Sequence, residues 1–223
     1  MNKYLVALLM TGSLLVVGCN KKQTRDEIYA EVRATGTITD AQAESLSKVN
    51  DLNLSGLTSI SDAQAESFSK VDSLWLNGLT SITDSQAESF SRVEKSISLN
   101  GLTTINDAQA ESLGNVRSLD LNGLTTLSDA QAESFSKVDY LYLNGLTSIT
   151  DAQAESLGNV GSLDLSGLTS ISDAQAESLS RVSWLKLHGL TSITDAQAES
   201  LSKVESLVIS QDLQPLIDKY RNE

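Results

Sequence analysis

The sequence predicts an α/β solenoid, with a parallel β-sheet along one side, short helices along the other, and about eight repeats closed by helical caps. Three observations predict this fold. The motif QAES recurs at a nearly constant spacing, a short stretch with alternating leucines accompanies each copy, and a glycine follows most of these stretches. Self-similarity at a period of roughly 20 to 50 residues is typical of solenoids.

The period is set by the aspartate that precedes each QAES motif. Consecutive aspartates lie 22 residues apart, except where Glu94 and Lys95 replace a single residue and the spacing becomes 23. The aspartates are Asp40, Asp62, Asp84, Asp107, Asp129, Asp151, Asp173 and Asp195. One repeat has too few apolar side chains to offset the conformational entropy lost on ordering it. Repetition is therefore a packing requirement, because each repeat buries its apolar faces against its neighbours.

Each repeat contains a short strand. In one repeat Leu74 and Leu76 alternate with Ser73, Trp75 and Asn77, which is the period of a strand with one buried face. We expect eight parallel strands, near positions 52, 74, 97, 119, 141, 163, 185 and 207. Gly78 follows at a position that is glycine in seven repeats, which predicts a backbone conformation that disfavours a Cβ atom.

Each repeat also contains a helix of about two turns. A Ser, Thr or Asn directly precedes the aspartate, and a Gln lies three residues after that Ser, Thr or Asn. This capping box recurs eight times. The aspartate complements the positive end of the helix. Glu and Lys or Arg four residues apart predict ion pairs on the helix surface. These pairs are Glu44–Lys48, Glu66–Lys70, Glu88–Arg92, Glu133–Lys137, Glu177–Arg181 and Glu199–Lys203.

The frame V-x-x-L-x-L-x-G-L-x-x-I, followed by a short helix, resembles the leucine-rich repeat family. The segments LTSI and LNGLT are similar to those of bacterial surface members, and the resemblance covers residues 37–210. The family usually has Asn or Cys three residues after the second strand leucine. Here that column is Leu57, Leu79, Leu102, Leu124, Leu146, Leu168 and Leu190. We therefore expect packing and backbone hydrogen bonds to hold the turn.

Two segments are predicted to cover the open ends of the solenoid, which would otherwise promote aggregation. Residues 25–36 form an N-terminal capping helix, with Ile28 and Val32 on one face. Residues 211–223 form a C-terminal cap, whose apolar side chains are Leu213, Leu216, Ile217 and Tyr220.

The N-terminus has the features of a secretory signal. Residues 1–18 combine Lys3 with an apolar stretch that is too short to span a membrane. This segment ends at Gly18, and Cys19 follows directly, which resembles the lipobox of bacterial lipoproteins. The resemblance implies an acylated Cys19 at the mature N-terminus, a linker over residues 19–24, and a place in the cell envelope. In Gram-negative lipoproteins Asn20 would favour the outer membrane over the inner one.

The charge balance disfavours nucleic acid as a partner. The chain has 16 basic and 29 acidic residues, a formal charge of −13. Removal of residues 1–18 takes away Lys3 and leaves 15 basic against 29 acidic residues, a charge of −14. A surface this acidic repels phosphate groups. Since Cys19 is the one cysteine of the chain, no intrachain disulfide can form.

Candidate binding residues are the large side chains at strand positions that point away from the core. Most of these positions are small and polar, so aromatic residues stand out. The candidates are Trp75, Tyr140, Tyr142, Asp164, Trp184, Lys186 and His188. All except Trp75 belong to three adjacent strands. Exposed aromatics anchor protein interfaces and stack on sugar rings, although they also simply suit strands.

Other kinds of site are weakly supported. The column of aspartates could bind Ca²⁺, but each is explained more simply by its own helix N-terminus. No catalytic motif is present, so we expect neither an enzyme nor a bound cofactor or metal. Three hypotheses stay open: a monomeric, lipid-anchored module that binds a protein, a module that binds carbohydrate, and a passive envelope scaffold.

Overall fold

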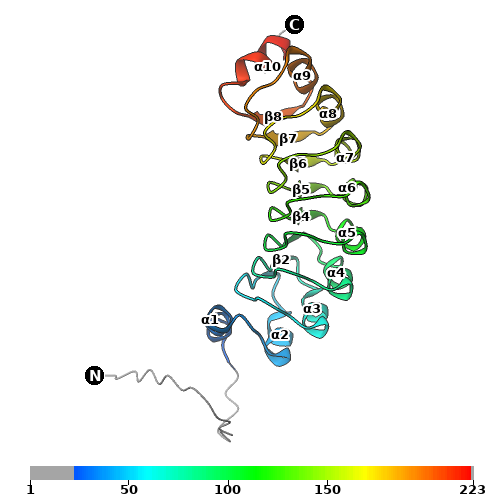
Figure 1. Ribbon diagram of the computed structural model, residues 1–223. Helices are drawn as coiled ribbons and strands as arrows, with labels where there is room; N and C mark the ends of the chain where they lie inside the picture. The colour runs from blue at the N-terminus through cyan, green and yellow to red at the C-terminus, as the bar shows by residue number, and fades with distance from the viewer. Residues whose placement is uncertain (1–22, 222–223) are drawn as a thin grey trace, which may run out of the picture.

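The computed structural model describes residues 23–221 of the chain. Its strands form one eight-stranded parallel sheet in which the order along the sheet is the order along the chain, from β1 to β8. The repeats follow one another in a gentle arc, with the row of helices on the outer side and the strands further in (Figure 1). The predicted α/β solenoid is confirmed.

The strands pair in register, so that equivalent residues of neighbouring repeats lie side by side. Leu119 pairs with Leu141, which in turn pairs with Leu163. The predicted strand positions are confirmed. The strands are β1 (Asp51–Asn53), β2 (Ser73–Trp75), β3 (Ser96–Ser98), β4 (Ser118–Asp120), β5 (Tyr140–Tyr142), β6 (Ser162–Asp164), β7 (Trp184–Leu187) and β8 (Ser206–Ile209).

The helices of the repeats begin at the aspartates that mark the period. They are α2 (Asp40–Leu46), α3 (Asp62–Phe68), α4 (Asp84–Phe90), α5 (Asp107–Leu113), α6 (Asp129–Phe135), α7 (Asp151–Leu157), α8 (Asp173–Leu179) and α9 (Asp195–Leu201). Each has the predicted capping box, formed in both directions. These seven-residue helices are too short to be stable alone, so packing in the stack must stabilise them.

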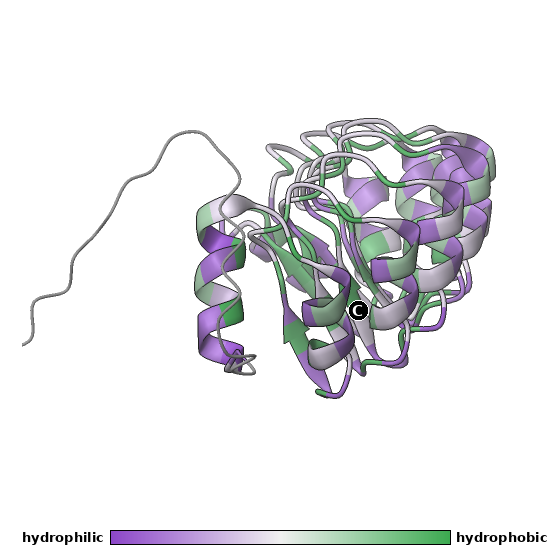
Figure 2. Cartoon of the chain, turned by 90° about the horizontal axis from the view of Figure 1, so that it is seen from below, coloured by the Kyte–Doolittle hydropathy of each residue, from purple (hydrophilic) through white to green (hydrophobic). Residues whose placement is uncertain are grey.

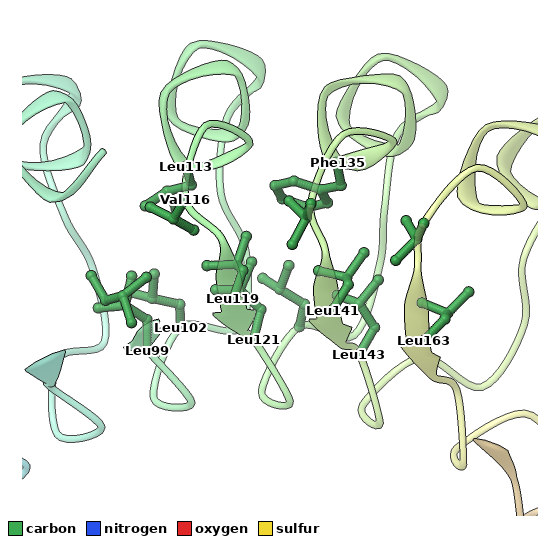
Figure 3. Packing of buried hydrophobic residues seen from close by; sticks show 14 of the residues in the cluster. Leu99, Leu102, Leu113, Val116, Leu119, Leu121, Phe135, Leu141, Leu143 and Leu163 are labelled. Atoms are coloured by element: carbon green, nitrogen blue, oxygen red, sulfur yellow. The ribbon is translucent and has the colours of Figure 1, made fainter. Parts of the chain in front are cut away.

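The core is a continuous column of aliphatic and aromatic side chains between the sheet and the helices. Leu141 of β5 and Leu143, which directly follows this strand, are completely buried, as is Phe135 of the preceding helix. Figure 3 shows the same arrangement in successive repeats, with Leu119, Leu141 and Leu163 on the strands and Leu113 and Phe135 on the helix side. The alternation seen in the sequence therefore marks the buried face of every strand.

The predicted ion pairs within single helices are wrong. Helix α4 ends at Phe90, so Arg92 lies beyond the helix. The four-residue spacing therefore does not bring Arg92 next to Glu88. Arg92 pairs with Glu66 of the preceding repeat, and Arg181 donates to the Glu155 carbonyl at 2.9 Å. Within residues 23–221, no ion pair joins the two members of any predicted pair. Arg92 and Arg181 link adjacent helices instead.

An asparagine ladder also links adjacent turns, in a column that was predicted to face solvent. Asn122 Oδ1 accepts the backbone N–H of Asn144 at 2.9 Å, and Asn144 Oδ1 accepts that of Ser166 at 3.2 Å. The same contact joins Asn77 to Asn100 and Asn100 to Asn122. Hence the expectation that only packing and backbone hydrogen bonds hold the turn is wrong. The ladder lies one residue before the glycine rather than in the leucine column.

A glutamine ladder connects the repeats on the helix side. Gln153 Oε1 accepts the N–H of its own N-cap residue Thr150 at 2.9 Å, and its Nε2 donates to the Leu127 carbonyl of the preceding repeat at 2.7 Å. The equivalent inter-repeat bond is made by Gln64, Gln86, Gln109, Gln131, Gln175 and Gln197. Each glutamine therefore serves both as a cap and as a link between repeats.

The recurring glycine is required by a close approach between turns, not by an unusual backbone conformation as the sequence suggested. Among the described glycines, only Gly36 has a positive φ, at 70°. A Cβ atom at Gly145 would lie 2.3 Å from the Leu124 carbonyl oxygen and 2.6 Å from that of Asn122. Both contacts are with backbone atoms of the preceding repeat. Glycine is needed because the turns stack too closely for any side chain.

The extra residue in the third interval is accommodated just before β3. Lys95 donates its backbone N–H to the Asp72 carbonyl at 2.7 Å, and its Nζ contacts Asp72 Oδ2 at 2.7 Å. The hydrogen bond to Asp72 raises the pKa of Lys95 above its usual value. Since Ser96 still pairs with Ser73, the insertion does not disturb the register of the sheet.

The ends of the solenoid are covered by helices. Ile28 and Val32 of α1 (Arg25–Thr35) are buried, and the Gly36 carbonyl accepts the N–H of Thr58 at 2.9 Å. At the other end, Ile217 of α10 (Gln214–Arg221) is buried and Arg221 Nη2 donates to the Val204 carbonyl at 2.9 Å. Viewed along the solenoid, hydrophobic residues occur in the strands and in parts of the helices, and α1 stands beside the first repeat (Figure 2).

The predicted signal segment 1–18 and Cys19 lie outside the described residues. Within the described part of the chain, none of the helices has the length and apolar character needed to cross a membrane.

Candidate ligand-binding surface on the strand face

The strand face is defined here as the outward side chains at the first and third positions of β1–β8. Most of them are serine, asparagine or aspartate. In one row Tyr140 of β5, Ser162 of β6 and Trp184 of β7 lie side by side, and in the next row Tyr142, Asp164 and Lys186 do so. The register therefore brings six of these outward residues together on three strands.

An open hollow of about 560 Å³ lies on this part of the strand face, and we name it the aromatic hollow. Three of the predicted binding residues, Tyr140, Tyr142 and Trp184, line it. Its other lining residues are Asp139, Gly161, Ser162 and Ser183, which were not among the predicted binding residues.

The hollow exists because small residues lie between large ones. In the position just before each strand, the side chain shrinks from Arg117 and Asp139 to Gly161 and Ser183. Within the strand row, Ser162 lies between Tyr140 and Trp184. Gly161 was the available signal in the sequence, because it interrupts a column that is otherwise polar or charged.

The aromatic side chains of the hollow are accessible. Tyr140 is 42% exposed, whereas Tyr142 and Trp184 are half-buried. Arg117 lies 5.9 Å from the centre of the Tyr140 ring, and its Nε is 3.2 Å from Asp139 Oδ2. One edge of the hollow therefore consists of an aromatic ring and a carboxylate that together hold a guanidinium group.

Asp164 was predicted as an outward binding residue, but it is only 3% exposed. Its Oδ1 accepts the backbone N–H of Ser166 at 3.0 Å, and its Oδ2 accepts from Lys186 Nζ at 3.0 Å. Asp120 has a similar position two strands away and accepts from Asn100 Nδ2 at 2.8 Å. These carboxylates organise the turn, so Asp164, which was predicted as an outward binding residue, has a structural role.

His188 and Trp75 do not line the hollow. His188 is exposed directly after β7, in the column that forms the asparagine ladder in earlier repeats. Trp75 is half-buried on β2, five strands away from Trp184 along the sheet. The structure therefore separates these two residues from the aromatic cluster.

The aspartate column at the helix N-termini is part of the contact between repeats. Asp129 Oδ1 accepts from Thr150 Oγ1 at 3.1 Å, and Asp151 Oδ1 accepts from Ser172 Oγ at 2.8 Å. Across residues 23–221, no group of three or more His, Cys, Asp or Glu side chains is placed to hold a metal ion. The column is explained by hydrogen bonds to the next repeat.

Comparison with known proteins identifies the fold. No protein-family model matches the sequence, and no curated protein matches it. A solved complex of TLR13 with ssRNA13 is similar, with a TM-score of 0.58 and 19% identity over 75% of this chain and 26% of that chain. An internalin (inlF) from Listeria monocytogenes str. 4b F2365 has a TM-score of 0.50 and 16% identity over 82% of this chain and 61% of that chain.

The chain spans less than two thirds of the length of either structure, 26% of the first and 61% of the second. At these identities the similarity concerns the fold alone. Both structures are leucine-rich repeat proteins, as the repeat frame of this sequence led us to expect. Eight parallel strands that alternate with short helices give this chain the fold of the leucine-rich repeat solenoids.

Proposed function

We propose that this protein is a lipid-anchored interaction module of the bacterial cell envelope that binds a protein partner through its strand face. The aromatic hollow is the observation on which this proposal depends. Tyr140, Tyr142 and Trp184 meet on a face whose other residues are mostly small and polar. Accessible tyrosine and tryptophan side chains that surround a depression are typical anchors of protein interfaces.

The leucine-rich repeat fold supports a protein as the partner, because the resemblance to this family implies binding rather than catalysis. One of the structural neighbours is a complex with ssRNA, so the fold as such is compatible with RNA in that protein. The formal charge of −13 is the ground for predicting that nucleic acid is not the partner here.

A double substitution, Tyr142→Ala with Trp184→Ala, tests the strand face. We expect it to abolish capture of the partner from an envelope extract, because it removes two anchors of one hollow. Trp75→Ala is the matched control, since it removes an aromatic from the same face outside the hollow. Binding that survives the double substitution but is lost in Trp75→Ala would refute the proposed surface.

Carbohydrate is the second candidate, because Tyr142 and Trp184 offer aromatic surfaces on which a sugar ring can stack. A glycan array with the same variants distinguishes it from a protein partner. A glycan signal that disappears in the double variant would favour carbohydrate. A passive scaffold predicts that neither assay gives a signal sensitive to these substitutions.

The proposed anchor rests on the sequence around Cys19. Two or more acyl chains give stable membrane attachment, since each buried CH₂ contributes about 0.8 kcal/mol. We expect Cys19→Ser to move the protein from the membrane fraction to the soluble fraction. The location follows from the same premise: the cell envelope, with the outer membrane favoured by Asn20 in a Gram-negative cell. Persistent attachment of the Cys19→Ser variant would contradict the anchor.

A further inference from the structure

We propose that the aromatic hollow binds the guanidinium group of an arginine side chain, presented by a basic segment of the partner protein. This inference rests on the proposed function, because it names the chemistry by which the strand face recognises its partner.

The lining of the hollow is suited to a cation. Three of its side chains are aromatic and one, Asp139, is a carboxylate, whereas none of its lining residues is basic. The faces of tyrosine and tryptophan rings attract cations, with tryptophan the strongest, and a nearby carboxylate adds a charge-assisted hydrogen bond.

Arg117 is an example of a guanidinium group bound at the edge of the hollow. Its guanidinium lies 5.9 Å from the centre of the Tyr140 ring and contacts Asp139 at 3.2 Å. Arg117 approaches from the β4 side of Tyr140, whereas the hollow lies on the β6 and β7 side. Both partners of this ion pair are 61% exposed, so the pair is weak and Asp139 is available to a second cation.

The spacing of the strands admits one flat group between the rings. Tyr140 and Trp184 are separated by one strand, with Ser162 between them. Two strand intervals give about 9.5 Å between the backbones of β5 and β7. A planar group in van der Waals contact with a ring on each side needs about 7–8 Å. Guanidinium is planar and stacks on aromatic faces, whereas an ammonium group is a compact charge without a flat face.

The surrounding charges favour a cation over a neutral or anionic ligand. Lys186 is neutralised by Asp164, and Arg117 is shared with Asp139. Glu205 adds an exposed acid directly before β8, the strand that pairs with β7. With Arg117 and Lys186 against Asp139, Asp164 and Glu205, the neighbourhood has one excess negative charge, and the chain as a whole has a formal charge of −13.

A set of three short peptides tests this inference on the full chain. The first has one arginine in a neutral background, the second has citrulline at that position, and the third has lysine. Citrulline keeps the planar shape and removes the charge. We expect the arginine peptide to bind about three- to thirtyfold more tightly than the citrulline peptide, and lysine to lie between them. Calorimetric titration measures all three affinities.

Substitutions in the hollow should act on the arginine peptide selectively. Tyr140→Leu and Trp184→Leu keep apolar bulk but remove the aromatic faces, so each should weaken arginine binding several-fold and leave citrulline binding nearly unchanged. Asp139→Asn should weaken arginine binding and reduce its dependence on salt. Trp75→Leu, on the same face but outside the hollow, should have no effect. Thermal unfolding of each variant verifies that the solenoid is intact.

The outcomes separate this inference from the proposed function. Equal affinity for arginine and citrulline, or no binding of either peptide, overturns the guanidinium site. If the protein partner is still captured in a manner sensitive to Tyr142 and Trp184, the proposed function stands without it. A glycan that binds in the hollow, with no preference for arginine, overturns the guanidinium site and replaces the protein partner with carbohydrate.

Discussion

Several single residues of this protein have structural roles that depend on contacts with the neighbouring repeat. Gly145 faces two carbonyl oxygens of the preceding turn, and Asn122 accepts a backbone N–H of the following one. The sequence showed that both residue types recur. It could not show why, because the reason is a distance between atoms about 22 residues apart.

Gly145→Ala should destabilise the protein by about 1–3 kcal/mol, because the new Cβ meets backbone atoms that cannot move independently. Chemical denaturation measures this loss. Gly161→Ala is the control, since its Cβ would lie 3.0 Å from one carbonyl oxygen, against 2.3 Å and 2.6 Å from two at Gly145. If Gly145→Ala costs no more than Gly161→Ala, close approach of the turns is not the reason for the glycine.

Asn122→Ala should cost about 1–3 kcal/mol, because the half-buried N–H of Asn144 loses its acceptor. Asn159→Ala is a suitable control: its Nδ2 donates to the Ser156 carbonyl of the same repeat at 3.2 Å, so no contact between repeats is lost. Equal unfolding free energies for the two variants would show that the asparagine ladder contributes nothing specific.

At the scale of the element, each helix is short but is linked on both sides. The capping boxes were predicted correctly because they depend on residues three positions apart in the chain. The ion pairs were predicted wrongly because the helices end after seven residues, before the basic side chain is reached. A spacing of four residues places two side chains together only while the helix continues.

Gln153→Glu separates the two roles of the glutamine. A carboxylate still accepts the N–H of Thr150, but it cannot donate to the Leu127 carbonyl. We expect a loss of about 1–3 kcal/mol at neutral pH. The carboxylate faces a carbonyl oxygen, so folding raises the pKa of the new Glu. The protonated form can donate, so the loss should shrink as the pH falls through the raised pKa of the folded state, and it should be smallest below the unfolded value of about 4.

Denaturation of the Gln153→Glu variant and the parent protein at several pH values tests this. A raised pKa in the folded state means that folding favours the protonated form. The variant should therefore gain stability relative to the parent as the pH is lowered. A difference that does not change with pH would show that the bond to Leu127 is unimportant.

The whole molecule is a stack in which each repeat contacts its neighbours. Deletion of residues 62–83, one full interval of 22 residues, joins Ser61 to Asp84 and preserves a capping box at the junction. We expect a folded protein with seven strands and somewhat lower stability, because nearest-neighbour interfaces are kept. Circular dichroism and cooperative thermal unfolding measure this. The variant lacks Trp75 but keeps the aromatic hollow, so arginine-peptide binding should be unchanged.

Deletion of residues 62–72, half of that interval, provides the control. It removes a helix without its strand and places the next repeat out of phase, so cooperative unfolding should be lost. If both deletions fold equally well, the repeats are not the units of stability.

The aromatic hollow also belongs to the whole molecule, because three consecutive repeats build it. Period-two alternation placed Tyr140, Tyr142 and Trp184 on one face of the sheet. The depression between them depends on Gly161, Ser162 and Ser183, whose effect appears only when adjacent strands are side by side.

The positions of the strands and of the repeat helices could be predicted from the residues alone, because they follow from patterns within a few residues that recur eight times. The need for glycine at the close approach, the links made by asparagine and glutamine, the burial of Asp164 and the hollow between Tyr140 and Trp184 became visible only in the folded stack. Each of these features depends on contacts between neighbouring repeats, whose distances no local pattern of residues specifies.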